Sequence, residues 1–181
     1  MLVPGSPCPM FIAAECVAII NGSATWIQQS TPLSGSTVEP QSIAYSPTLN
    51  RCVTVGDNAL GTAAVMYSDN GTTWTRVASA DDNANWDCVQ WMDNVSLFTA
   101  LGNKAGAQKC MTSADGLTWT LQADPAGGGS NRIAYSSTLG RALAVNDGGS
   151  STISVLESTN GTTWNGSSTN GAWDNRWHGA S

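Results

Sequence analysis

A short motif recurs along this chain of 181 residues at a nearly constant interval, and this recurrence constrains the fold more than any other feature. Its three clear copies are Ser68-Asp69-Asn70-Gly71-Thr72-Thr73-Trp74, Ser113-Ala114-Asp115-Gly116-Leu117-Thr118-Trp119 and Ser158-Thr159-Asn160-Gly161-Thr162-Thr163-Trp164. Their tryptophans are 45 residues apart in both steps. A degenerate fourth copy, Asn21-Gly22-Ser23-Ala24-Thr25-Trp26, ends 48 residues before Trp74. The chain is therefore expected to repeat one supersecondary unit.

A second element recurs between these motifs and has the pattern of two strands joined by a turn. Residues 41–55 align with residues 131–145, and a diverged version occupies residues 87–101. In the second unit we expect four strands, at residues 42–46, 51–55, 63–68 and 73–77. Four short antiparallel strands at this interval are typical of a propeller blade. The predicted fold is all-β: a small β-propeller of four four-stranded antiparallel blades.

The predicted single domain spans residues 1–181, and its two ends have the pattern of two parts of one blade. The repeats cover residues of about 1–40, 41–85, 86–130 and 131–172, followed by a closing strand at 173–181. Trp173–His178 is similar to the start of the third unit, so we expect it to pair with Met10–Glu15 and complete the first blade. Closure would remove exposed sheet edges. The alternative is that another chain completes this blade.

Charge and composition exclude several partner classes. Only 11% of the residues are charged, the net charge is −6, and the seven basic residues are scattered. Phosphate binding needs clustered positive charge, so we predict neither nucleic acid nor an anionic membrane as a partner. The start of the chain has no basic residue before its apolar residues, so no signal peptide is expected.

The five cysteines are odd in number and irregular in spacing, with no CxxC pair, so a zinc site is not predicted. Cys52 and Cys110 lie in strand-like runs at positions that other repeats fill with small apolar residues. We expect them to be buried, reduced thiols, which favours folding in a reducing cytoplasm. The acidic turn at Asp81-Asp82 matches no complete calcium loop and is interpreted as a solvated turn. No metal and no cofactor is predicted.

The repeated motif has the chemistry of a tight turn. Its Ser and its Asp or Asn can accept hydrogen bonds from the turn backbone, and its Gly can adopt a positive φ. The motif resembles the Asp-box of the sialidase-type β-propellers, a Ser-x-Asp-x-Gly-x-Thr-Trp pattern or a form one residue shorter. Only Asp115 keeps the acid, because Asn70 and Asn160 replace it. The predicted structural box residues are Ser68, Asn70, Gly71, Thr73, Trp74, Ser113, Asp115, Gly116, Thr118, Trp119, Ser158, Asn160, Gly161, Thr163 and Trp164.

The resemblance implies a fold element rather than an activity, because in that family the box lies at the blade periphery. Family catalysis uses three arginines, a tyrosine with a glutamate partner, and an acid/base aspartate. The arginines of this chain do not match, since Arg51 and Arg141 occupy equivalent repeat positions, as do Tyr45 and Tyr135. No catalytic residue is predicted, and His178, the sole histidine, has no partner pattern.

The eight tryptophans are the best indication of binding. Four of them are repeat residues and therefore structural, whereas the other four occur in only two of the units. These candidate ligand-binding residues are Trp86, Trp91, Trp173 and Trp177. Their aromatic faces could stack on sugars or anchor a protein partner. The alternative is a locally larger core.

The preferred functional hypothesis is a non-catalytic structural or attachment protein of a virion, such as a bacteriophage capsid decoration or tail component. Its partners would be other virion proteins, a glycan or a host receptor, with homo-oligomerisation as a further possibility. It would be made in the host cytoplasm and located in the virion. The first alternative is a lectin-like carbohydrate-binding module, and the second, largely discounted, is a sialidase fragment. Fold alone does not decide among these classes.

Overall fold

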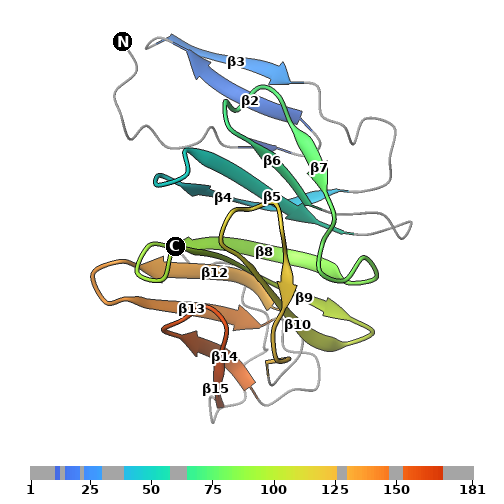
Figure 1. The fold of residues 1–181 in the computed structure, drawn as a ribbon, viewed down its shortest axis with the longest axis vertical. Coiled ribbons are helices and arrows are strands. Elements are labelled where there is room, and N and C mark those ends of the chain that lie inside the picture. The colour runs from blue at the N-terminus through green and yellow to red at the C-terminus, as the bar shows by residue number, and fades with distance from the viewer. Residues whose placement is uncertain are drawn as a thin grey trace.

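Every regular element that the structure describes is a β-strand. The computed structural model describes residues 11–12, 15–20, 23–29, 39–57, 65–125, 130–146 and 153–168. These ranges contain no helix, and thus none that could cross a membrane. The strands form separate antiparallel sheets that stack in chain order, with the first at the top of Figure 1 and the last at the bottom. The all-β prediction is confirmed.

Each sheet is a meander in which strands that follow one another in the sequence also pair. The first sheet contains β1 (Phe11–Ile12), β2 (Glu15–Ile20) and β3 (Ser23–Gln29). The second contains β4 (Pro40–Ser46), β5 (Arg51–Gly56), β6 (Val65–Ser68) and β7 (Thr75–Val77). The third contains β8 (Asn85–Met92), β9 (Leu97–Lys104), β10 (Ala107–Ser113) and β11 (Thr120–Leu121). The fourth contains β12 (Ser130–Ser136), β13 (Arg141–Asn146), β14 (Ile153–Ser158) and β15 (Asn165–Ser168).

The last three sheets repeat the same local geometry. Each begins with a strand that has a one-residue register shift, followed by a four-residue turn. The fourth turn residue has a positive φ in every copy: 49° at Asn50, 52° at Ser96 and 59° at Gly140. Asn and Gly tolerate this conformation better than most residues do, which explains the type of residue at two of the three positions. The repeat seen in the sequence is therefore a repeat of backbone conformation.

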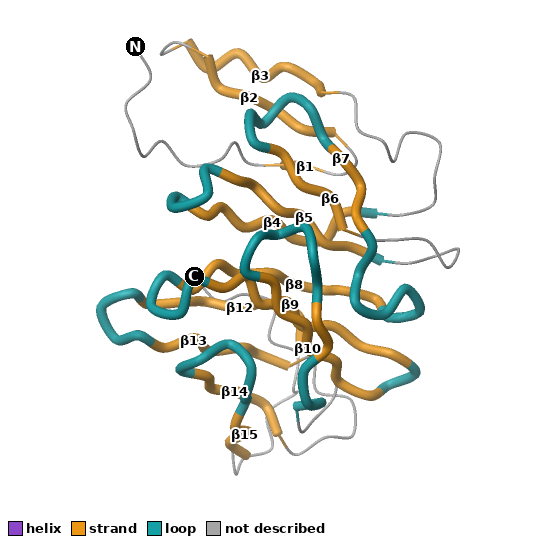
Figure 2. The backbone as a smooth tube through the Cα atoms, viewed as in Figure 1, coloured by secondary structure: helices purple, strands orange, loops and turns teal. Residues whose placement is uncertain are grey.

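The hydrophobic core lies between the sheets. One cluster joins the second and third sheets and includes Val53, Trp86 and Phe98. Another joins the third and fourth sheets and includes Leu101 and Leu156. The third sheet is thus covered on both faces, and its first strand, β8, packs against both β4 and β12 (Figure 2). Successive sheets that contact through their first strands are arranged as in a propeller.

The strands predicted for the second unit are confirmed to within two residues at each described boundary. Four-stranded sheets are confirmed for three units, while the first sheet has three described strands. The sheets do not form a closed ring in the described part of the chain. The predicted closing strand at 173–181 lies outside the described residues. The number of blades and the closure of the first blade therefore stay predictions.

Candidate functional site

The repeated heptapeptides form three equivalent turns, which we call the box turns (residues 68–74, 113–119 and 158–164). In each, the serine Oγ accepts a hydrogen bond from the glycine N–H, at 2.8, 2.7 and 2.9 Å in chain order. The Oδ1 of the third residue accepts from the backbone N–H groups two and three residues further along the chain, at 2.8 to 3.0 Å. Because these bonds satisfy the turn backbone, each box turn is held in one conformation. The expected turn chemistry is therefore present.

Asp115 and its equivalents Asn70 and Asn160 accept the same backbone hydrogen bonds in their box turns. Burial raises the pKa of Asp115, but hydrogen bonds from the N–H groups of Thr118 and Leu117 outweigh this effect, so its pKa lies below the ordinary value. An amide oxygen at Asn70 or Asn160 accepts the corresponding bonds without a charge. The acid is thus not needed for the turn, which agrees with its replacement in two of the three copies.

Each box turn ends in a buried tryptophan. Trp74, Trp119 and Trp164 have exposed fractions of 6, 8 and 6%. The indole Nε1 of Trp164 donates to the carbonyl oxygen of Gly161 in its own turn, at 3.3 Å. Large apolar rings of this kind contribute burial area and fix the turn against the sheet. All three rings thus lie in the hydrophobic core.

The box glycines lie where one sheet contacts the sheet before it. A Cβ on Gly116 would come within 2.7 Å of Val53 Cγ2, on the preceding sheet. At the next step, a Cβ on Gly161 would come within 3.1 Å of Met92 Sδ and 3.5 Å of Thr99 Cβ. Both glycines also have a positive φ, of 73° and 74°. The second and third sheets therefore each present one face to the box turn of the following sheet, and we call this face, and its equivalent on the fourth sheet, the receiving face.

Side chains on the receiving faces also bond to box-turn carbonyl oxygens. Arg51 Nη1 donates to the carbonyl oxygen of Asp115 at 2.6 Å, while its Nε and Nη2 bind the carboxylate of Asp69. In the next contact, Thr99 Oγ1 donates to the carbonyl oxygen of Gly161 at 2.8 Å. Asn94 Nδ2 donates to the carbonyl oxygen of Thr159 at 3.0 Å. Buried backbone carbonyls need such partners, so these donors help to fix the stacking of the sheets.

The receiving face of the fourth sheet is exposed. Val53 and Thr99 are each 0% exposed, whereas Leu143, which occupies their position on β13, is 46% exposed. Leu139, in the turn before β13, is 71% exposed. Side chains that face the third sheet, such as Ala142 and Ala144, are fully buried. An exposed apolar sheet face of this kind marks a candidate interaction site.

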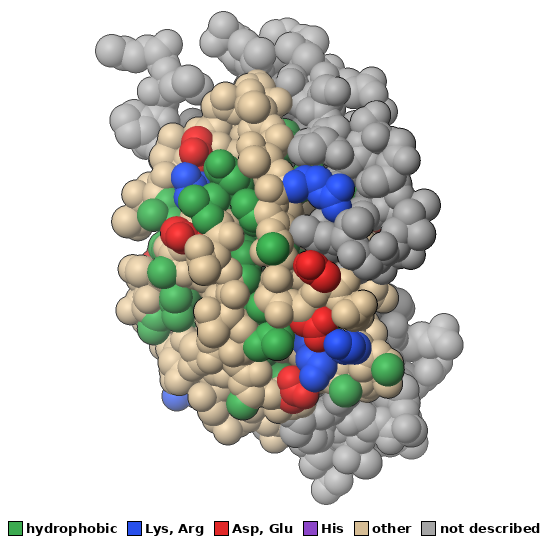
Figure 3. All heavy atoms as spheres, turned by 45° about the vertical axis from the view of Figure 1, so that its right-hand side comes forward, with side chains coloured by type: hydrophobic (Ala, Val, Ile, Leu, Met, Phe, Trp, Pro, Cys, Tyr) green, Lys and Arg blue, Asp and Glu red, His purple; other side chains and the backbone are tan. Residues whose placement is uncertain are grey.

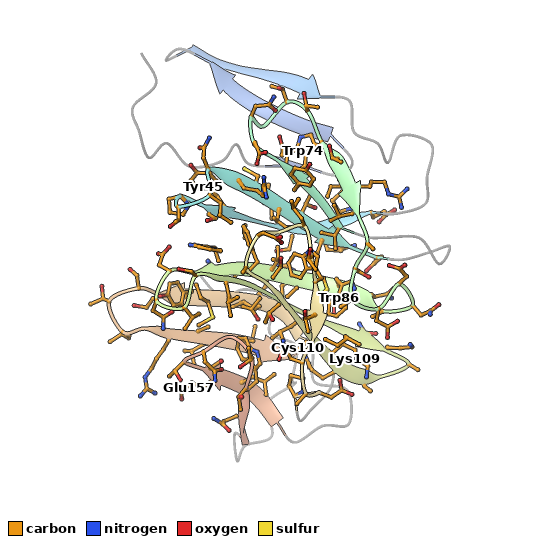
Figure 4. All side chains as sticks on the ribbon, viewed as in Figure 1. Tyr45, Trp74, Trp86, Lys109, Cys110 and Glu157 are labelled. Atoms are coloured by element: carbon orange, nitrogen blue, oxygen red, sulfur yellow. The ribbon has the colours of Figure 1, made fainter. Side chains whose placement is uncertain are left out.

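Arg141 stands on the same face, at the position of Arg51. Its Nη1 forms an ion pair with Glu157 across the sheet. Glu157 is labelled in Figure 4, near the lower end of the stack. Arg51 combines an ion pair to Asp69 with a bond to the next box turn, so Arg141 has the same donor chemistry available to it. The candidate site thus pairs apolar side chains with a guanidinium donor.

The predicted ligand-binding tryptophans do not form a surface platform among the described residues. Trp86, which is labelled in Figure 4, is 0% exposed. Trp91 is 3% exposed, and both belong to the cluster between the second and third sheets. Trp91 packs edge-on against Phe98, with ring centroids 4.7 Å apart. A sugar stacks only on an accessible face, so burial favours the larger core that was the alternative. Trp173 and Trp177, like His178, lie outside the described residues.

The described cysteines differ from one another. Cys88 and Cys110 are buried and are not disulfide-bonded, as expected for Cys110. Burial raises the pKa of the Cys110 thiol to about 11 and that of Cys88 further still. Cys52 is disulfide-bonded, so its predicted reduced state is wrong. The alignment predicted a small buried residue at position 52, and Cys52 is 4% exposed, but an alignment of repeats does not identify a bonding partner.

Four ion pairs join charged side chains within the described residues. Lys104 Nζ lies 2.8 Å from Asp81 Oδ2, and Lys109 Nζ lies 2.6 Å from Asp124 Oδ2. Basic and acidic side chains are interspersed on the face drawn in Figure 3. The pairing of Asp81 supports the interpretation of its loop as a turn. No group of three metal-ligating His, Cys, Asp or Glu side chains occurs in the described ranges.

Comparison with known proteins informs the fold alone. No family model and no curated protein matches the chain. A chain in the crystal structure of a nidogen–laminin complex is similar, with a TM-score of 0.53 and 12% identity over 78% of this chain and 51% of that one. A GH74 enzyme of Niastella koreensis has a TM-score of 0.27 and 15% identity, over 82% of this chain and 37% of the enzyme. The chain thus spans about half of the first of these solved chains. Together with the stacked sheets, this similarity identifies a propeller-like all-β fold.

Proposed function

We propose that this chain is a non-catalytic structural protein that works through protein–protein or receptor contacts, as a capsid decoration or tail component of a virion. The observation that carries the proposal is the exposed receiving face of the fourth sheet. Leu143 is 46% exposed there, while its two equivalents are completely buried by a following sheet. A surface already shaped for a sheet-to-sheet contact is suited to assembly.

The described arginines support a structural role. Arg51 and Arg141 occupy equivalent positions of different repeats. Each forms an ion pair with an acidic side chain of its own sheet. Arg51 also bonds to the neighbouring box turn. The contact of Arg51 with the box turn links two sheets, whereas the ion pair of Arg141 lies within its own sheet. A sialidase-type role for them has no supporting contact.

The carbohydrate-binding alternative now depends on Trp173 and Trp177. The other two candidates, Trp86 and Trp91, are buried. A glycan array probed with the intact chain and with a Trp173→Ala, Trp177→Ala variant tests this alternative. Binding that disappears in the variant would replace the structural proposal by a lectin-like one.

The structural proposal is tested by locating the chain in virus particles from its source. Particles are purified through a density gradient and the chain is quantified by mass spectrometry against the major capsid protein. We expect a constant copy number across the particle peak, because a structural component is present in a fixed ratio. A chain that is abundant in the infected-cell extract but absent from the particles would contradict the proposal.

A further inference from the structure

We propose that the receiving face of the fourth sheet binds the first sheet of a second copy of this chain. This inference rests on the proposed function, since both assign assembly to that face, and it adds the identity of the partner. The occupant is inferred from the way in which the chain packs against itself at two earlier positions.

Three rows of equivalent side chains show which surface is open. In the row across the sheet centre, Val53 and Thr99 are buried and Leu143 is exposed. In the neighbouring row along the same strands, Val55 and Leu101 are each 0% exposed, while Val145 is only partly buried. In the row on the third strand of each sheet, Val65 and Cys110 are fully buried and Val155 is partly buried. The strand registers place these rows side by side. The whole face, rather than one side chain, thus lacks the cover that the other two have.

The polar part of the contact is also in place. In the first contact Arg51 donates to a box-turn carbonyl oxygen, and in the second Thr99 and Asn94 do so. Arg141 repeats the position of Arg51 and lies on the exposed face beside Leu143. A partner that offers a box turn would therefore satisfy both the apolar and the polar groups of this face. Complementarity of this kind distinguishes a specific interface from non-specific hydrophobic association.

The order of the units indicates which partner this is. In both described contacts the receiving face is filled by the unit that follows in the repeat, and after the fourth unit the cycle returns to the first. The first sheet lies at the opposite end of the stack from the fourth (Figure 1), so in this arrangement it is available to another copy. The sequence of the first unit keeps the glycine and the tryptophan of the box. Two copies joined head to tail in both directions would close into a ring with both faces covered.

The test is the molar mass of the intact chain in solution, measured by sedimentation equilibrium over a range of concentrations. We expect a dimer for the unmodified chain and a monomer for Leu143→Asp. Leu121→Asp is the matched control, because Leu121 on β11 is 45% exposed and lies away from the face. The control should remain a dimer. Since the ring contains the contact twice, the milder Leu143→Ala should weaken dimerisation roughly a hundredfold.

Two outcomes would overturn the inference. One is a monomeric intact chain at all concentrations, which would mean that the face stays open or is closed by the chain itself. The other is a dimer that persists in Leu143→Asp, which would place the contact elsewhere. Thermal unfolding of each variant shows whether it is folded, and Leu143→Ala serves if Leu143→Asp is not. The particle assay is a separate measurement: a dimer that is absent from particles would refute the proposed function alone.

Discussion

Replacing Gly116 by alanine tests the contact on which the stacking of the sheets depends. The substitution has two costs, and the chain offers a control that has only one of them. Gly106 has a φ of 83°, and a Cβ there meets no atom within 4 Å. Gly106→Ala therefore carries only the penalty for a positive φ, about 1–2 kcal/mol. Gly116 has a similar φ, but its new Cβ would come within 2.7 Å of Val53 Cγ2.

The additional cost at Gly116 is that of overpacking. Forcing a methyl group into a filled core typically costs about 1–3 kcal/mol. Gly116→Ala should thus lower the free energy of unfolding by about 2–5 kcal/mol, clearly more than Gly106→Ala does. Val53→Ala removes the atom that clashes, at a cost of its own of about 2–3 kcal/mol. The double variant should be more stable than the sum of the two single effects predicts, by about 1–3 kcal/mol.

The assay is urea unfolding followed by tryptophan fluorescence, with all variants at the same protein concentration because association would add to the apparent stability. The slope of the unfolding free energy against urea should be unchanged. Equal losses at Gly116 and Gly106 would refute the account, and so would strict additivity of Gly116→Ala with Val53→Ala. Either result would mean that the second and third sheets do not contact each other through this glycine.

Four further predictions concern the box turns and the buried thiols. In urea unfolding at neutral pH, the free energy of unfolding of Asp115→Asn should stay within about 1 kcal/mol of that of the unmodified chain. That of Asp115→Ala should fall by about 1–3 kcal/mol, because two backbone N–H groups lose their acceptor. Folding lowers the pKa of Asp115, so its contribution to the free energy of unfolding is complete above the unfolded pKa of about 3.9 and is lost as the pH falls through the lower folded pKa. Asp115→Asn should not lose this stability in acid. Equal acid sensitivity of the two proteins would contradict the role of the Asp115 carboxylate as the acceptor in this turn. Thr99→Val should cost about 1–3 kcal/mol in the same assay, since it removes the donor to the carbonyl oxygen of Gly161, and an unchanged stability would show that this bond is not needed. Cys88 and Cys110 should resist alkylation in the native chain and react once it is unfolded, as counted by intact-mass spectrometry, because burial raises both thiol pKa values; rapid native labelling would refute their burial.

The sequence was sufficient to predict the repeated unit and its turns. Their residues act locally: Ser68, Asn70 and Gly71 bond within one turn, so their spacing alone predicts the conformation. The strands of the second unit followed from the same periodicity. Local hydrogen bonding of this kind depends only on residues close together in the sequence, so the turn conformation is kept although the repeats have diverged.

The sequence was not sufficient to predict which side chains the stacking buries. Trp86 and Trp91 occur outside the repeat pattern, which made them candidates for a ligand site, yet both lie in the core. Their strand belongs to the third sheet, which packs against a neighbouring sheet on each face, so these aromatic side chains are enclosed. Leu143 shows the converse, since alignment gives it the position of the buried Val53 but not the missing neighbour. Burial here is a property of contacts between units, which a single unit does not encode.

A photo-crosslink from position 143 would identify which segment, of the same chain or of another copy, covers the receiving face of the fourth sheet. A photoreactive leucine replaces Leu143, the chain is irradiated in solution, and the product is mapped by mass spectrometry in an equal mixture of isotopically light and heavy chains. If a second copy binds there, we expect crosslinks between a light and a heavy chain, from position 143 to the segment 15–29 that contains β2 and β3. Crosslinks formed only within single chains, or none to that segment, would contradict it.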